Sequence, residues 1–276
     1  MENKVRLYLH RIRTYYRLQT ANGSNHLTAT LHLPAHGLQQ WRLWSKYPTY
    51  VKTLHGFGQY DLPLLASYSR SGTNWVRYFL ETVTGQPTPG QSRLHQGHNY
   101  CIDRAHRAFK IMHHYQKVVL LVRDYRECVL RHHRDIWHAY PDPTTLLTDE
   151  GLEQPPLWYI RNLQTFDKFQ GNKLLLYYED LVQQPMSTLS QLASFLALDP
   201  ERTKAFLQDI KTHEAASVQV YKGGGHRSES SFSKDLKYHA KTKLTPDQVK
   251  EFDEFYFSRY PEIANKYLTR YDTRCP

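Results

Sequence analysis

Three short apolar runs along this chain of 276 residues constrain its fold most strongly, because each is followed by a segment with helical spacing. They are LPLLA at 62–66, KVVLLVRD at 117–124 and NKLLLYYEDL at 172–181. Continuous apolar runs of this length are typical of strands that are buried on both faces, as in a parallel sheet. Strands that alternate with helices in this way predict an α/β fold with a central parallel β-sheet flanked by helices.

One domain spanning residues 1–276 is the simplest interpretation, because no repeat, low-complexity segment or clear boundary stands out. Within it we expect an irregular N-terminal part at 1–60, a core at 62–198 and helices at 199–276. We expect a loop at 141–156 and helices at 104–115, 127–140, 157–169 and 186–198, and one more helix with Thr245 as its N-cap and Pro246 in its first turn.

The charge balance favours an anionic partner. The formal net charge is +10, which suits nucleic acid, an acidic membrane or a phosphorylated ligand. The basic residues are scattered, so a basic tail is not expected. Three Cys without a CxxC pair argue against a disulfide framework or a structural zinc site. The start has no apolar core of a signal peptide, and no stretch reaches the roughly 20 apolar residues of a membrane span, so we expect a cytoplasmic protein.

The segment SYSRSGTNW at 67–75 has the features of an anion-binding loop. A strand enters a loop of small residues, and a helix begins directly after it, so backbone N–H groups and the helix dipole favour negative charge there. Gly72 allows a tight turn, Ser71, Thr73 and Asn74 add short donors, and Arg70 adds a positive charge. An ordinary β–α turn with a Ser or Thr cap is the alternative. The loop does not follow the pattern GxxxxGK[ST], which disfavours an ordinary P-loop kinase.

At three places in order, the chain resembles the sulfotransferases that use 3′-phosphoadenosine 5′-phosphosulfate (PAPS). SYSRSGTNW at 67–75 is similar to the family's 5′-phosphosulfate loop, TYPKSGTTW. VVLLVRDYRECVLRHH at 118–133 is similar to its 3′-phosphate segment, a strand leading to RNPxDxxxS. LLLYYEDLVQQPMSTLSQLASFLAL at 174–198 is similar to a third family stretch, and YKGGGHRS at 221–228 is a weaker match to the last phosphate-binding segment.

The resemblance implies a sulfotransferase fold with a P-loop-like nucleotide-binding architecture. It implies an enzyme that moves the sulfuryl group of PAPS to a hydroxyl or amine of a small molecule, leaving adenosine 3′,5′-bisphosphate, without a metal. Arg70 would hold the 5′-phosphosulfate and stabilise charge on the leaving oxygen. The other residues assigned by the resemblance are Ser71, Gly72, Thr73, Asn74 and Trp75 for the 5′-phosphosulfate, Arg123 and Arg131 for the 3′-phosphate, Tyr178 for the adenine, and Lys222, Gly223 and Arg227 for closing over the 3′-phosphate.

Two positions depart from the family pattern. Arg131 stands where the family has a Ser, so the 3′-phosphate would be bound with a different geometry. Tyr221 stands where the family usually has an Arg, and no Trp follows it in that segment.

The resemblance also calls for a base between the first two motifs, and a His suits this role near neutral pH. LHQGHNY at 94–100 contains two candidates, and His98 fits the family pattern better than His95. His106 is a third candidate, while the acids Glu81 and Asp103 fit less well. We therefore predict His98 as the base.

Two other functions stay open on the sequence. A metal-dependent phosphotransferase would need carboxylates for its metal, and Asp124 at a strand end is the one candidate. A basic nucleic-acid-binding protein would fit the charge and the Tyr content, but no binding motif is present. We expect a small-molecule acceptor as partner, of specialised metabolism, and neither nucleic acid nor membrane. Family members are often dimers, so a homodimer is left open.

Overall fold

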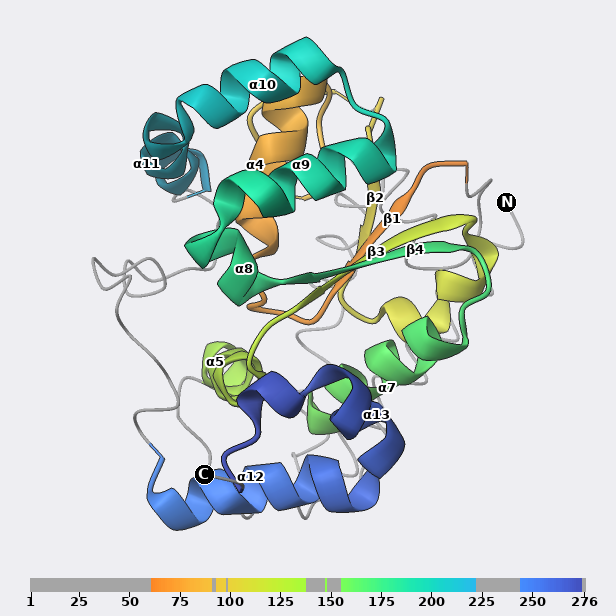
Figure 1. Ribbon diagram of the computed structural model, residues 1–276, viewed down its shortest axis with the longest axis vertical. Coiled ribbons are helices and arrows are strands. Elements are labelled where there is room, and N and C mark those ends of the chain that lie inside the picture. The colour runs from red at the N-terminus through yellow and green to blue at the C-terminus, as the bar shows by residue number, and fades with distance from the viewer. Residues whose placement is uncertain are drawn as a thin grey trace, which may run out of the picture. The chain divides into compact units, whose positions relative to one another are not determined.

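The sheet in the computed structural model of this protein has four parallel strands among the described residues, in the order β2–β1–β3–β4 (Figure 1). The strands are β1 (Leu64–Ser67), β2 (Asp103–Ala105), β3 (Lys117–Val122) and β4 (Asn172–Tyr177). The structure describes residues 61–90, 93–97, 99–137, 147, 155–221 and 244–274. All of these lie in one compact unit, Thr49–Pro276.

Helices connect the strands and continue after the last one. The α-helices are α4 (Thr73–Thr84), α5 (Tyr125–Trp137), α7 (Pro155–Lys168), α8 (Tyr178–Gln183), α9 (Pro185–Leu196), α10 (Pro200–Gln208), α11 (Ile210–Tyr221), α12 (Pro246–Arg259) and α13 (Pro261–Tyr267). Among the described residues, three short 3-10 turns are η1 (Ala108–Lys110), η2 (Met112–His114) and η5 (Thr269–Tyr271). None of the helices within the described ranges is long and apolar enough to cross a membrane.

The helices cover both faces of the sheet, and the alternation of side chains along each strand serves the two faces. Leu64 and Leu120 belong to a buried cluster with α5, α7, α12 and α13. Leu65 and Leu121 belong to a second cluster with α4, α9, α10 and α11. Figure 1 shows these two groups of helices on opposite sides of the strands. Because both faces are covered, the strands are continuously apolar, as the sequence indicated.

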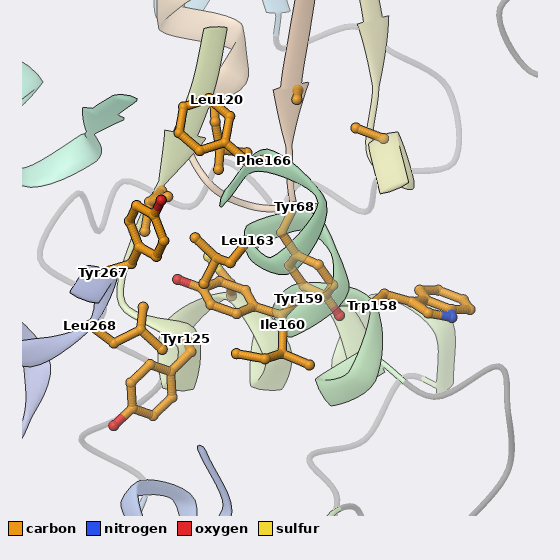
Figure 2. Packing of buried hydrophobic residues seen from close by; sticks show 14 of the residues in the cluster. Tyr68, Leu120, Tyr125, Trp158, Tyr159, Ile160, Leu163, Phe166, Tyr267 and Leu268 are labelled. Carbon is orange, nitrogen blue, oxygen red and sulfur yellow. The ribbon is translucent and has the colours of Figure 1, made fainter. Parts of the chain in front are cut away.

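The first cluster reaches from the sheet to the C-terminal helices (Figure 2). Tyr68, which follows β1, lies beside Tyr159 of α7, with ring centroids 5.5 Å apart. Tyr125 at the start of α5 contacts Tyr256 of α12, with centroids 4.5 Å apart. Aromatic rings therefore pack against the residues that directly follow β1 and β3.

The predicted α/β fold with a central parallel sheet is confirmed, and so is the capping of α12 by Thr245, whose hydroxyl accepts from the Gln248 amide at 3.3 Å. The helix predicted at 104–115 is wrong. This segment contains the end of strand β2 and the turns η1 and η2. The segment Asp103–Ala105 has three residues, two of them charged, so only its pairing with β1 makes it a strand. Most of the predicted loop at 141–156 lies outside the described residues.

Candidate functional site

The carboxyl ends of all four described strands meet at one edge of the sheet. Ser67 at the end of β1 pairs with Leu121, and Val122 at the end of β3 pairs with Tyr177. The loop after β1 and the residues that follow β2, β3 and β4 therefore gather at this edge. Ligands of parallel α/β sheets bind at this edge, so the register of the strands sets the location of the candidate site.

The loop between β1 and α4 turns through two residues in the left-handed region. Arg70 has φ 72°, and Gly72, the residue that precedes α4, has φ 88°. A Cβ atom at Gly72 would overlap the ring of Tyr178, so the absence of a side chain lets Tyr178 lie directly against the loop. Gly72 also has no side chain to cap the first turn of α4, and the N–H groups at such a helix start are suited to bind an anion.

The polar side chains of the loop are held by neighbours. The hydroxyls of Ser67 and Thr73 lie 2.8 Å apart. Arg77, which is 2% exposed, donates from Nη1 to Oδ1 of Asn74 at 3.1 Å. Since Oδ1 of Asn74 accepts from Arg77, the amide NH₂ group is the part of this side chain that can donate to an anion.

Two of the predicted loop residues are packed inward. The hydroxyl of Ser71 is buried, 3.4 Å from the thiol of Cys128 on α5. The hydroxyl of Ser71 is therefore directed toward α5, and its backbone N–H donates to the carbonyl of Tyr68 at 3.3 Å. Trp75 stacks on Tyr78 with ring centroids 6.0 Å apart, next to Phe206 of α10 at 5.8 Å. Burial raises the pKa of Cys128 to about 12, so its thiol stays protonated.

Arg123, the residue after β3, brings the second strand end to the loop. Its Nη1 donates to the backbone carbonyl of Arg70 at 3.2 Å. Its guanidinium lies over the ring of Tyr178, with Cζ 4.1 Å from the centroid. The predicted residues Arg70, Gly72, Arg123 and Tyr178 thus come from three strand ends and lie together.

Arg131 lies two turns further along α5, on the same side as Arg123. Its Nε is 3.0 Å from Oε2 of Glu127, and Nη2 of Arg123 is 3.8 Å from the same oxygen. Glu127 is 2% exposed, so one buried carboxylate lies between two arginines. Burial and the charge of Arg123 lower the pKa of Arg131 from its ordinary value. The arrangement therefore brings two cations together around one buried carboxylate at the end of β3.

His106 follows β2 at the same edge of the sheet. Its Nδ1 lies 3.2 Å from both the hydroxyl and the carbonyl oxygen of Ser67, next to the loop. Burial, followed by the nearby charge of Arg104, lowers the pKa of His106 to about 3. The imidazole is therefore neutral at physiological pH and can accept a proton. His106 was the third candidate on the sequence, where a helix rather than strand β2 was expected at this point.

The remaining candidates are placed as follows. His98, Lys222, Gly223 and Arg227 lie outside the described residues. The backbone N–H of His95 donates to Oε2 of Glu81 at 3.3 Å. Glu81 is buried and also accepts from the hydroxyl of Tyr221 at 3.2 Å. Asp103 is buried too and accepts from the hydroxyl of Tyr115. The carboxylates of Glu81 and Asp103 are therefore engaged in hydrogen bonds within the protein. Across the described part of the chain, no group of three His, Cys, Asp or Glu side chains could hold a metal ion.

Comparisons with known proteins point to one family, the sulfotransferases. The sequence profile of the sulfotransferase domain matches residues 105–263, more than half of the chain. The crystal structure of mouse sulfotransferase SULT7A1 complexed with PAP is similar, with a TM-score of 0.56 and 16% sequence identity, over 78% of this chain and 89% of that chain. A sulfotransferase structure from Alicyclobacillus acidocaldarius has a TM-score of 0.39 and 10% identity, over 62% of this chain and 98% of that chain. No curated protein matches the chain. The likeness to SULT7A1 confirms the predicted fold.

Proposed function

This chain belongs to the sulfotransferase domain family, and we propose that it transfers the sulfuryl group of PAPS to a hydroxyl or amine of a small-molecule acceptor. The observation that carries the proposal is the meeting of the 68–75 loop, Arg123, Tyr178 and His106 at one edge of the sheet. This edge offers backbone donors, two arginines and a neutral imidazole. The net charge of +10 also favours a donor with several negative charges.

The loop is the proposed site of the 5′-phosphosulfate. The backbone N–H groups of the first turn of α4 and the amide NH₂ of Asn74 would donate to its oxygens. Arg70 would stabilise the charge that develops on the leaving oxygen, a role in which a preorganised cation lowers the barrier. Thr73 and Trp75 would complete this half of the site, Thr73 through its hydroxyl and Trp75 through its ring.

The ends of β3 and β4 are the proposed site of the 3′-phosphoadenosine. Arg123 and Arg131 would bind the 3′-phosphate, for which charge-assisted hydrogen bonds to two guanidinium groups are suited. Tyr178 would contact the adenine. Lys222, Gly223 and Arg227 stay candidates for closing over the 3′-phosphate.

We propose His106 as the base, with His98 as the alternative. If Nδ1 of His106 donates to the Ser67 carbonyl, the lone pair lies on Nε2, which fixes the tautomer that can accept a proton. His106 would take the acceptor's proton as the bond from the acceptor to sulfur forms and the bond from sulfur to the 5′-phosphate oxygen breaks. The imidazole is neutral at physiological pH, so Nε2 is unprotonated before this step, but burial also makes it a weaker base than a solvated His.

The other expectations are part of the same proposal. The acceptor stays a small molecule of unspecified class, the reaction requires no metal, and the enzyme acts in the cytoplasm. Neither nucleic acid nor a membrane is a partner, and a homodimer stays open. Asp124, the one candidate metal ligand of a phosphotransferase, accepts from the Arg126 side chain at 3.1 Å and from its backbone N–H at 3.0 Å. No observation favours that alternative.

A binding test separates the three functions. The wild-type chain is titrated with PAPS in the absence of metal, and then with ATP in the presence and absence of Mg²⁺. The proposal expects PAPS to bind without metal and to be displaced by adenosine 3′,5′-bisphosphate. Binding of ATP only with Mg²⁺ would favour a phosphotransferase, and salt-sensitive binding of oligonucleotides without any of PAPS would favour a nucleic-acid-binding protein. Transfer of ³⁵S from PAPS to a panel of phenols, alcohols and amines then identifies the acceptor class.

A further inference from the structure

The short C-terminal turn η5 contacts both strand ends that form the 3′-phosphoadenosine half of the proposed site. This turn, Thr269–Tyr271, lies beyond residues 105–263, which match the family profile. It is therefore a feature of this chain that the family match does not include. Residues far apart in the sequence contact η5, among them Glu179 and the buried Arg126.

On one side, η5 holds the beginning of α8. The hydroxyl of Tyr271 donates to Oε2 of Glu179 at 2.5 Å. Arg270 donates to both carboxylate oxygens of Asp180, at 2.8 and 3.0 Å. Glu179 and Asp180 directly follow Tyr178, so two neighbouring side chains of η5 fix the backbone that presents the Tyr178 ring.

On the other side, Tyr271 holds the beginning of α5. Its backbone carbonyl accepts from Nη2 of Arg126 at 2.5 Å, and Arg126 pairs with Asp124 at 3.1 Å. The backbone N–H of Asp124 donates to Oε1 of Glu179 at 3.3 Å. Asp124 directly follows Arg123, so Tyr271 is connected through Glu179 and Arg126 to the backbone on which Arg123 sits.

A buried carboxylate anchors this arrangement. Asp253 of α12 has no exposed surface and accepts from Nη1 of Arg126 and from the backbone N–H of Thr273, at 3.0 and 3.1 Å. The hydroxyl of Tyr125 donates to the same carboxylate. Asp253, Arg126 and Asp124 are each at most 3% exposed, so the charges of these three side chains pair with one another away from solvent. Such a network has few alternative arrangements, which makes it suited to hold a fixed spacing.

We propose that Tyr271 is a positioning residue that sets the spacing between Arg123 and Tyr178, and thereby the preference of the site for nucleotides with a 3′-phosphate. This role rests on the proposed function, because it presumes that Arg123 binds the 3′-phosphate and Tyr178 the adenine. Tyr271 itself touches neither the loop nor the proposed nucleotide contacts. A purely structural role would instead affect stability and all nucleotides alike.

The test is Tyr271→Phe, which removes one hydroxyl and keeps the ring and the carbonyl. Adenosine 3′,5′-bisphosphate and adenosine 5′-monophosphate, which differ only in the 3′-phosphate, are titrated into both proteins. The expected result is roughly a tenfold loss of affinity for the bisphosphate, the scale of a lost hydrogen bond to a charged group, and less than about a twofold loss for the monophosphate.

Tyr267→Phe is the matched control. Its hydroxyl donates to Asp167 of α7 at 2.7 Å, and its backbone carbonyl, which accepts from the Tyr177 hydroxyl at the end of β4, is retained in the variant, so both affinities should stay unchanged. If Tyr271→Phe does not fold, Glu179→Gln removes the same charged bond from the other side and should give the same selective loss. Unchanged affinity for the bisphosphate, or equal losses for both nucleotides, would overturn the role of Tyr271 alone. Failure of the wild type to bind the bisphosphate would overturn the proposed function and this role with it.

Discussion

The two halves of the proposed donor site are held together in different ways. In the 5′ half, two of the side-chain contacts join near neighbours: Ser67 and Thr73 are six residues apart, and Asn74 and Arg77 are three apart. In the 3′ half, the contacts span the chain: Glu179 and Tyr271 are 92 residues apart, and Arg126 and Asp253 are 127 apart. The comparison teaches that a local motif can form half of a site, whereas the other half depends on how the whole unit packs.

The largest expected effect is on catalysis and falls at the junction of the two halves. His106 reaches the loop from β2, 39 residues away from Ser67. His106→Gln should lower kcat by roughly 10²–10⁴-fold, the usual contribution of a general base, while the affinity for adenosine 3′,5′-bisphosphate stays the same. Steady-state kinetics with the acceptor found in the transfer assay, together with calorimetry, measure both quantities. Full activity in His106→Gln, with loss in His98→Gln, would move the role to His98.

The next effect tests whether the 3′ half depends on distant buried charges. Asp253→Ala leaves Arg126 without one of its buried partners and should lower the free energy of unfolding by about 3–5 kcal/mol. Urea denaturation of the wild type and Asp253→Ala measures this change in the free energy of unfolding. The control is the neighbouring Glu254→Ala, which breaks an exposed pair with Lys250 and should cost at most about 0.5 kcal/mol. Similar losses in the two variants would contradict the importance of the network.

Two glycines test the local half. Gly72 and Gly85 flank the same helix with φ of 88° and 71°, so replacement by Ala should introduce strain of about 1–2 kcal/mol at each. A Cβ at Gly72 overlaps the Tyr178 ring, whereas one at Gly85 meets only Nη1 of Arg202 at 3.6 Å. We therefore expect Gly72→Ala, and not Gly85→Ala, to weaken nucleotide binding. Equal affinities in the two variants, measured by calorimetry, would show that the contact between Tyr178 and the loop is unimportant.

The smallest expected effect is on the pH dependence of stability. Burial lowers the pKa of His106 from 6.5 to about 3, so below pH 6.5 the unfolded chain binds a proton at this side chain that the folded chain does not. Stability therefore falls as the pH is lowered. His106 should account for about 1 kcal/mol of the loss between pH 6.5 and 5.5. Urea denaturation of the wild type and His106→Gln at both pH values measures how much stability each protein loses between pH 6.5 and 5.5. The same loss in both proteins would contradict the low pKa of His106.

The same comparison explains how much could be predicted from the sequence. The parallel sheet and the loop before α4 could be predicted, because continuous apolar runs and a turn centred on Gly72 are recognisable in the local sequence. Strand β2 could not be, because Asp103–Ala105 has three residues and no apolar period, and forms only by pairing with β1. The position of His106 beside the loop could not be predicted for the same reason. The contacts of Tyr271 could not be predicted either, since no local pattern connects it with Glu179 or Arg126.

One titration tests directly whether Arg123 binds the 3′-phosphate at the end of β3. Adenosine 3′,5′-bisphosphate is titrated by calorimetry, without metal, into the wild type, Arg123→Ala and Arg259→Ala. Arg259→Ala removes the same charge from an exposed position on α12 and controls for the change in net charge. The account predicts tight binding by the wild type and Arg259→Ala, and a loss of about 2 kcal/mol or more in Arg123→Ala, the scale of a lost charged hydrogen bond. No binding by the wild type, or equal binding by all three proteins, would contradict a 3′-phosphate site at the end of β3.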